Sequence, residues 1–342
     1  METNRNFAVD WLKGWMIISI VIYHSFFLTG FRGYLAVDVF FFLSGYFLML
    51  SFLKKPTTAV QYTWGRIKVL AIPFIICLLV SCLFRYHLFS GFDSFDSAIE
   101  QYGRFFFALP FAEEFGGEVT RNNFLLGSWF LSVLVIASFL LYGLLQFNHR
   151  LAVLVVFPAI VLLGYNAMML QSDTVDGWVT IGVLSIRLVR GLVEMAAGAL
   201  ICFIYLEHKS GVERRAVLIN IIGIIASFFL VSMMFAKQSL DKFFVVVIPW
   251  IVLSVVIEGS WLKKVLGWMG NRSMVAWIGR YTLYVYCAHG PVELFVYWAN
   301  DHLFHRSLHG GLLLSVYLVT LAIASILLFR LCRVVKKANN VC

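Results

Sequence analysis

Charged residues are scarce in this chain: Asp, Glu, Lys and Arg together make up 13% of its 342 residues. Hydrophobic residues make up 61%, and the mean hydropathy is +0.87. Soluble globular domains carry about 25% charged residues and have no need of so much apolar surface. The composition therefore excludes a soluble protein and predicts an integral membrane protein surrounded by lipid.

Cysteine is also rare, with six residues that lie in apolar runs or near the C-terminus. None lies in the long polar segment 90–123, and their spacing fits neither a disulfide framework nor a metal site. His302, His305 and His309 leave a metal site open as an alternative, but a solvated loop is the favoured interpretation. We expect no metal cofactor.

Three further patterns are missing from the sequence. The first apolar run lacks a cleavage site of small residues, which excludes a cleavable signal peptide. No internal repeat and no low-complexity linker are present. The chain ends soon after its last apolar run, so we expect one membrane domain over residues 1–342 with no appended soluble domain.

Apolar runs long enough to cross a bilayer are what the sequence does contain. They predict an all-α polytopic membrane protein with about ten transmembrane helices, at residues 14–30, 35–53, 69–89, 124–146, 151–170, 183–206, 216–235, 243–260, 276–299 and 311–332. An even number places both termini on one side. Most Lys and Arg fall on that side, so both termini are predicted to be cytoplasmic. The net charge of +9 thus reflects topology, and we expect no nucleic-acid partner.

The first apolar run combines three ionisable residues, Asp10, Lys13 and His24. Eleven residues, about 16 Å of helix, separate Lys13 from His24, so both lie on one helical face and His24 is expected about halfway across the bilayer. Asp10, one turn earlier, is expected to pair with Lys13. Because an intramembrane ionisable group is costly, the set indicates function. The alternatives are a histidine that only stabilises the bundle and an interfacial lysine.

Two more groups of polar residues precede or open helices. Asp38 is followed by three Phe and by Ser44-Gly45. It either caps its helix near the outer interface or belongs to an acceptor site, and Ser44-Gly45 permits close helix contact. Arg66 and Lys68 precede the third helix, where fixed positive charge suits the phosphates of a coenzyme. Their alternative role is to mark the inner membrane face.

The sixth and ninth apolar runs also contain polar groups. Arg187, Arg190 and Glu194 lie at the start of the sixth run, and Arg190 and Glu194 are expected to pair at i,i+4 and to face protein or water. That pair is either structural or functional. His289 stands directly before Gly290-Pro291, which is predicted to break the helix and so to place His289 at a cavity.

These residues resemble the acyltransferase 3 family of bacterial inner-membrane acyltransferases. Four segments carry the resemblance: Asp10, Lys13 and His24; residues 34–46, through Val37, Asp38, Phe40, Phe41, Ser44 and Gly45; Ser128–Val133, around Trp129; and Gly279–Pro291, through Gly279, Tyr286 and His289. Lys13 stands where the family more often has Arg, and Leu134 where many members have Glu.

The resemblance implies a membrane O-acyltransferase that moves an acyl group, most commonly acetyl, from cytosolic acetyl-CoA to a sugar hydroxyl of a cell-surface polysaccharide or a lipid-linked precursor. A hydroxyl is a poor nucleophile and needs a base, which suits His24 as general base or as transient acyl carrier. Lys13, Arg66 and Lys68 would bind CoA. Asp10 and Asp38 would assist catalysis, as would Lys13. The expected substrate contacts are Asp38, Ser44, Trp129, Arg187, Arg190, Glu194 and His289.

A proton-coupled transporter or flippase is the alternative function. The same intramembrane His, Asp, Arg and Glu residues would then form a proton relay. The absence of an inverted repeat counts against it.

Overall fold

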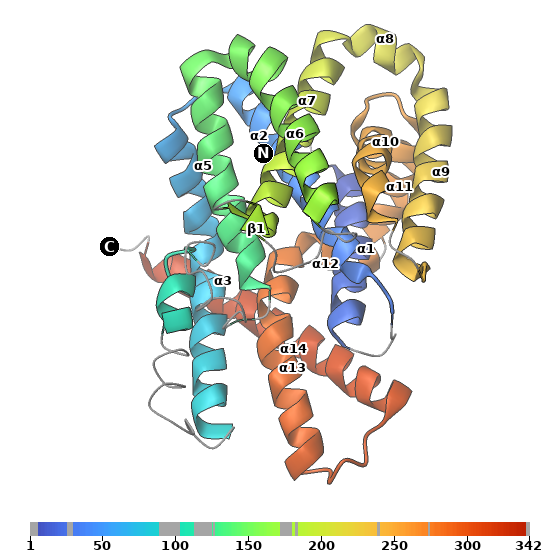
Figure 1. Ribbon diagram of the computed structural model, residues 1–342. Coiled ribbons are helices and arrows are strands. Elements are labelled where there is room, and N and C mark those ends of the chain that lie inside the picture. The colour runs from blue at the N-terminus through green and yellow to red at the C-terminus, as the bar shows by residue number, and fades with distance from the viewer. Residues whose placement is uncertain are drawn as a thin grey trace. The chain divides into compact units, whose positions relative to one another are not determined.

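The computed structural model describes residues 6–25, 30–88, 103–112, 125, 127–171, 180–181, 184–237, 240–272 and 274–339 (Figure 1). Nearly all of these are helical. The only strands within these ranges, β1 (Thr180–Ile181) and β2 (Leu184–Ser185), pair antiparallel with Thr180 opposite Ser185. The all-α prediction is confirmed. Most of the polar segment 90–123 lies outside the described residues.

The chain folds into two compact units that alternate along the sequence. The first comprises Met1–Tyr23, Thr29–Trp64 and Leu134–Arg280, and the second His24–Leu28, Gly65–Val133 and Tyr281–Cys342. His24, the last residue of α1 (Phe7–His24), thus belongs to the second unit. The prediction of one domain over the chain stays a prediction.

Helices of the first unit pack closely where glycines face backbone. Its further elements are η1 (Gly33–Leu35), α2 (Ala36–Lys54), most of α5 (Ser128–Leu151), a π-turn η4 (Ala152–Val156), α6 (Phe157–Gln171), α7 (Ile186–Glu207), α8 (Lys209–Arg214), α9 (Ala216–Phe235), η5 (Asp241–Phe243), α10 (Phe244–Val256), α11 (Trp261–Arg272) and α12 (Met274–Arg280). A Cβ added to Gly45 of α2 would lie 1.9 Å from the Met195 carbonyl oxygen of α7. The expected close contact at Ser44-Gly45 is confirmed.

The second unit contains most of α3 (Ala59–Leu88), a short helix at 103–108, the start of α5, α13 (Thr282–His302) and α14 (Gly310–Asn339). Aromatic rings join these elements. Phe84 of α3 stacks on Phe295 of α13 with ring centroids 5.9 Å apart. Tyr281 and Tyr284 meet Phe329 of α14 at 4.7 and 5.3 Å. α13 and α14 are therefore neighbours with α3 packed against α13.

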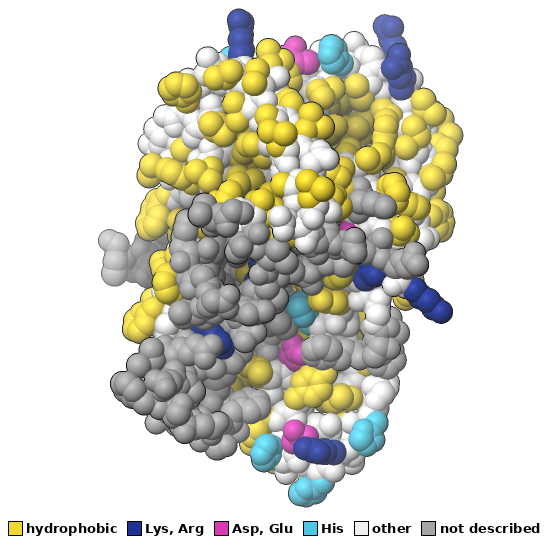
Figure 2. All heavy atoms as spheres, viewed as in Figure 1, with side chains coloured by type: hydrophobic (Ala, Val, Ile, Leu, Met, Phe, Trp, Pro, Cys, Tyr) yellow, Lys and Arg dark blue, Asp and Glu magenta, His cyan; other side chains and the backbone are white. Residues whose placement is uncertain are grey.

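Seven helical stretches among the described residues are long and apolar enough to cross a membrane, or up to eight if the bent pair α10–α11 is one broken span. One stretch, Ser128–Gln171, runs for 44 residues, about twice what one crossing requires, and its backbone leaves the helical region at Asn148. Hydrophobic side chains cover much of the visible surface over α5, α6 and α9 (Figure 2), and Leu170 and Phe228 are 86% and 71% exposed. A polytopic membrane protein is supported, and the count of ten crossings stays a prediction.

Two sequence-based boundaries are wrong. The first helix is expected at residues 14–30 with His24 at its middle, whereas α1 spans Phe7–His24 and His24 is its last residue. The helix starts earlier because its polar residues lie against protein: Asp10 is buried, and the Lys13 ammonium lies 5.7 Å from the centre of the Phe47 ring.

The predicted break at Gly290-Pro291 is also absent, because α13 continues through Pro291 to His302. Proline removes one backbone hydrogen bond, and a helix packed against its neighbours tolerates that loss. His289 is nevertheless buried, with 0% of its surface exposed.

Candidate active site

Two histidines meet in the second unit. His24 ends α1 and His289 lies in the middle of α13, and their ring centroids are 5.1 Å apart with the ring planes tilted by 37°. His24 is partly buried and His289 is fully buried. The sequence marks each histidine separately, and the fold brings them together.

The hydrogen bonds of His289 fix which of its nitrogens holds a proton. Its Nδ1 contacts the backbone carbonyl of Tyr286 one turn earlier. A carbonyl only accepts, so Nδ1 carries the hydrogen and Nε2 keeps a lone pair. Nε2 is buried and has no hydrogen-bond partner. His289 is thereby prepared to accept a proton from a neighbouring group.

Tyr286 and the start of α5 hold this imidazole in place. The Tyr286 hydroxyl donates to the Gly127 carbonyl at 2.7 Å, and its ring lies 5.2 Å from that of Phe130. Gly127 has φ +78°, and a Cβ there would lie 2.7 Å from the Tyr286 hydroxyl and 3.3 Å from Cε1 of His289. Trp129, two residues further on, is buried. The Trp129 and His289 segments of the sequence analysis therefore lie side by side.

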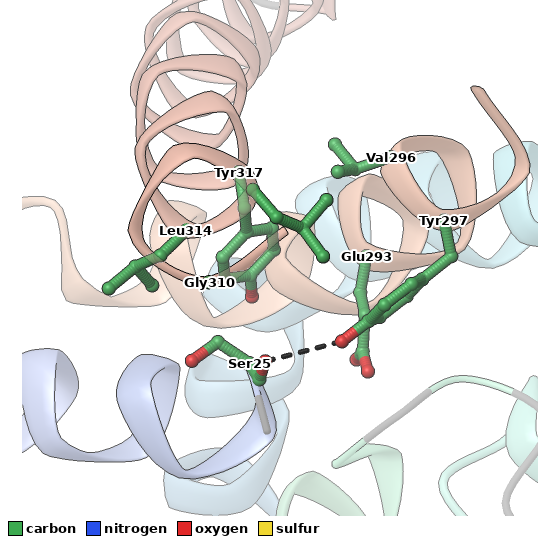
Figure 3. Close-up of a pocket in the computed structure, with 8 residues that line it drawn as sticks. Ser25, Glu293, Val296, Tyr297, Gly310, Leu314 and Tyr317 are labelled. Atoms are coloured by element: carbon green, nitrogen blue, oxygen red, sulfur yellow. Dashed lines mark hydrogen bonds between the residues drawn. The ribbon is translucent and has the colours of Figure 1, made fainter. Parts of the chain in front are cut away.

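The second unit also contains a cavity of about 210 Å³ (Figure 3). It is lined by Ser25, Glu293, Val296, Tyr297, Gly310, Leu313, Leu314 and Tyr317. Ser25 follows His24 in the chain, and Glu293 is one helical turn after His289. The sequence analysis missed Glu293, Tyr297 and Tyr317. The four-residue spacing from His289 is the signal by which Glu293 could have been found.

Polar groups line one side of this cavity. The Tyr297 hydroxyl donates to the Ser25 carbonyl at 3.2 Å, which ties α13 to the residue after His24. The Tyr317 hydroxyl is buried and has no hydrogen-bond partner. The side chains of Glu293, Tyr297 and Tyr317 converge on the same space (Figure 3). Such a space can bind a hydroxylated group.

A second polar centre lies in the first unit, where Asp38 of α2 pairs with Arg190 of α7. Arg190 Nε donates to Asp38 Oδ1, and Nη2 donates to Asp38 Oδ2 at 2.8 Å, with both side chains fully buried. Nη2 also donates to the Tyr34 carbonyl at 3.0 Å. The expected i,i+4 pair of Arg190 and Glu194 forms no hydrogen bond, because neither Glu194 oxygen has a partner. Asp38 is the better partner because it faces the guanidinium with two oxygens at once.

The ion pair continues into residues that sequence analysis did not select. The Tyr34 hydroxyl donates to Asp241 Oδ2 at 2.8 Å, and Arg32 Nη1 donates to Asp241 Oδ1 at 3.4 Å. Asp241 is only 1% exposed. One polar network thus joins the segments before α2 and before α10 to α7.

Glu194, one turn after Arg190, is fully buried, and neither carboxylate oxygen has a hydrogen-bond partner. Asp38 and Arg190 are the charged groups that interact electrostatically with the Glu194 carboxyl group. Arg187 is buried one turn before Arg190, and Ser44 of α2 is partly buried. Arg190 and Glu194 therefore face protein, in agreement with their prediction, and Arg187 does so as well.

The expected CoA-binding cations lie in both units. Lys13 is in the first unit, over Phe47, while Arg66 and Lys68 lie on α3 in the second unit with Lys68 exposed. That Lys13, Arg66 and Lys68 share one ligand stays a prediction, as does pairing of Asp10 with Lys13.

Among the described residues, no three His, Cys, Asp or Glu side chains lie close enough together to hold a metal ion. The ring of His302 stacks on Trp298 with centroids 5.2 Å apart.

One comparison with known proteins is informative. A family model described as an acyltransferase domain matches residues 6–330, nearly the whole chain. No curated protein and no solved structure matches the sequence.

Proposed function

The chain belongs to the acyltransferase 3 family of membrane acyltransferases, and from that membership we propose that it transfers acetyl from cytosolic acetyl-CoA to a sugar hydroxyl. The acceptor would be a cell-surface polysaccharide or its lipid-linked precursor. The observation that supports this chemistry best is the close approach of His24 and His289.

The reaction requires a base and a path for one proton. The acceptor oxygen forms a bond to the acetyl carbonyl carbon, and the bond from that carbon to the CoA sulfur breaks. In direct transfer, His24 takes the hydroxyl proton and returns it to the departing thiolate. In the alternative, His24 itself carries the acetyl group briefly and His289 takes the acceptor proton. The free lone pair of His289 Nε2 supports a part in either route.

Positively charged side chains are proposed to bind the acyl-CoA donor. We propose that Lys13, Arg66 and Lys68 contact the CoA phosphates and that Asp10 orients Lys13. A positive or hydrogen-bond-donating group also stabilises the oxyanion that forms on the thioester carbonyl. No metal is invoked.

We propose roles in substrate binding for the polar groups of the first unit. Both oxygens of Asp38 are engaged by Arg190, which supports a positioning role for Asp38 rather than contact with the acceptor. Glu194 has unbonded oxygens and so suits contact with the substrate or with water. Ser44, Arg187, Trp129 and His289 are the remaining proposed substrate contacts.

The proposed topology places both termini in the cytosol, with about ten crossings of a bacterial inner membrane. The distribution of Lys and Arg supports this orientation. It puts the start of α1, with Lys13, on the side of the donor. The opposite end, with His24, then faces the acceptor.

Donor binding tests this proposal with purified protein in nanodiscs and labelled acetyl-CoA. We expect saturable binding that weakens in Lys13→Ala and is unchanged in Lys264→Ala, an exposed lysine of α11. His24→Ala is expected to bind donor normally. A well-folded sample that binds no acyl-CoA would contradict the proposal and favour a transporter in which the histidines carry protons.

A further inference from the structure

We propose that the cavity of Ser25, Glu293, Tyr297 and Tyr317 is the acceptor subsite and that it takes an uncharged hydroxylated ring, because no cation lines it to bind an anionic sugar. This inference rests on the proposed function and adds the charge class of the acceptor. The cavity residues all lie in the second unit, and none of the four belongs to the motifs of the sequence analysis.

The cavity is linked to the two histidines through the residues that line it. Ser25 is the residue after His24, and its carbonyl accepts a hydrogen bond from Tyr297. Glu293 follows His289 by four residues on the continuous helix α13, so the two side chains point from the same face. The lining therefore contains the residue that follows one of the two histidines and a residue one helical turn after the other.

The cavity has unmet hydrogen-bonding capacity. Tyr317 is 4% exposed and its hydroxyl has no partner. A ligand group able to donate and accept would supply the missing hydrogen bond. A sugar hydroxyl does both. Leu313, Leu314 and Val296 supply an apolar wall for the C–H face of the same ring.

Charge decides the class of ligand. The eight lining residues include one carboxyl group, Glu293, and no Lys, Arg or His. A bound carboxylate or phosphate would find no cation in the lining to offset the cost of burying its charge. The cavity is therefore unsuited to the CoA phosphates and to uronic acids, and it suits a neutral sugar.

The size agrees with one ring. A volume of about 210 Å³ is far more than a single water needs and less than the roughly 300 Å³ at which pockets for drug-sized ligands begin. The rest of a polymeric acceptor must then lie outside the cavity.

Saturation-transfer NMR on the full-length protein in nanodiscs tests the subsite without catalysis. The probes are the methyl glycosides of glucose, galactose and mannose, with methyl glucuronide as the anionic probe. We expect at least one neutral glycoside to bind wild type, and to bind Tyr317→Phe about 3- to 10-fold more weakly, as for loss of one hydrogen bond. Methyl glucuronide should bind neither wild type nor Glu293→Gln, because neither has a cation in the lining.

Matched controls lie on the same helix. Tyr284→Phe removes a hydroxyl outside the cavity, and Asp301→Asn removes an exposed carboxylate at the end of α13. Both should bind the probes as wild type does. Wild type that binds no neutral glycoside, or Tyr317→Phe that binds as wild type does, overturns the subsite.

Hydrolysis of acetyl-CoA in the absence of sugar separates this inference from the proposed function. One outcome is hydrolysis that depends on His24 and is unchanged in Tyr317→Phe, with sugar binding also unaltered in Tyr317→Phe. That outcome supports the acyltransferase and rejects the proposed subsite. The opposite outcome is sugar binding that depends on Tyr317, with no acetyl-CoA turnover in wild type. It supports the subsite and rejects acetyl-CoA as the donor.

Discussion

The rings of His24 and His289 lie 5.1 Å apart although α1 and α13 stand at opposite ends of the chain. His289 donates from Nδ1 to the Tyr286 carbonyl, so its remaining nitrogen is free to take a proton. Tyr286 in turn donates to Gly127 at the start of α5. This chain of contacts joins three separate segments of the sequence into one site.

Removal of either histidine should abolish transfer without unfolding the protein. General acid–base groups contribute about 10²- to 10⁴-fold, so we expect losses of that order in CoA release for His24→Ala and for His289→Ala. Because the two act as a unit, the double variant should be no slower than the slower single variant. His302→Ala is the control, because His302 is an exposed histidine. Losses that multiply in the double variant would show that the histidines act independently.

Gly127→Ala should lower both thermal stability and activity. The positive φ costs an alanine about 1–2 kcal/mol, and the new methyl would press on the Tyr286 hydroxyl and on His289. Gly259→Ala is a matched control, because Gly259 also has positive φ, +83°, but nothing lies within 4 Å of its added Cβ. Thermal unfolding in detergent and CoA release are measured for both. Equal activity in the two variants would contradict a role for this contact.

The buried ion pair of Asp38 and Arg190 should respond asymmetrically to substitution. Asp38→Ala leaves the buried guanidinium without its carboxylate and should destabilise the protein by about 3–5 kcal/mol. The double variant Asp38→Leu/Arg190→Met should recover most of that stability. Glu258→Ala, which breaks an exposed pair with Lys209, should change the unfolding temperature little. A double variant as unstable as Asp38→Ala would contradict this account.

Reporter fusions test the proposed topology. A green fluorescent protein fused after Cys342 should fluoresce, because it folds in the cytosol, and an alkaline phosphatase fused there should be inactive. Active phosphatase would place the C-terminus outside and reverse the assignment of the donor and acceptor sides.

The sequence identifies the ionisable residues of the site but not their partners. His24, Asp38, Arg190, Glu194 and His289 are found because each is costly within an apolar run. Arg190 has two candidate carboxylates, and the local i,i+4 rule selects Glu194, whereas the packing of α2 on α7 selects Asp38. Only the three-dimensional fold distinguishes them.

The residues missed by the sequence analysis carry little or no local signal. Gly127 and Tyr317 matter through neighbours far along the chain, and nothing in their local sequence marks them, whereas Glu293 is marked only by its spacing from His289. The helix boundaries failed for a related reason. Asp10 and Pro291 usually end apolar helices, yet here packing against the rest of the protein accommodates both within α1 and α13.

Release of CoA from acetyl-CoA by purified wild type and His24→Ala tests the central claim most directly. A thiol reagent follows release in nanodiscs, first without acceptor and then with a cell-surface glycan fraction. We predict slow release by wild type, acceleration by the glycan, and loss of both in a normally folded His24→Ala sample. Release by His24→Ala at the rate of wild type would contradict the account.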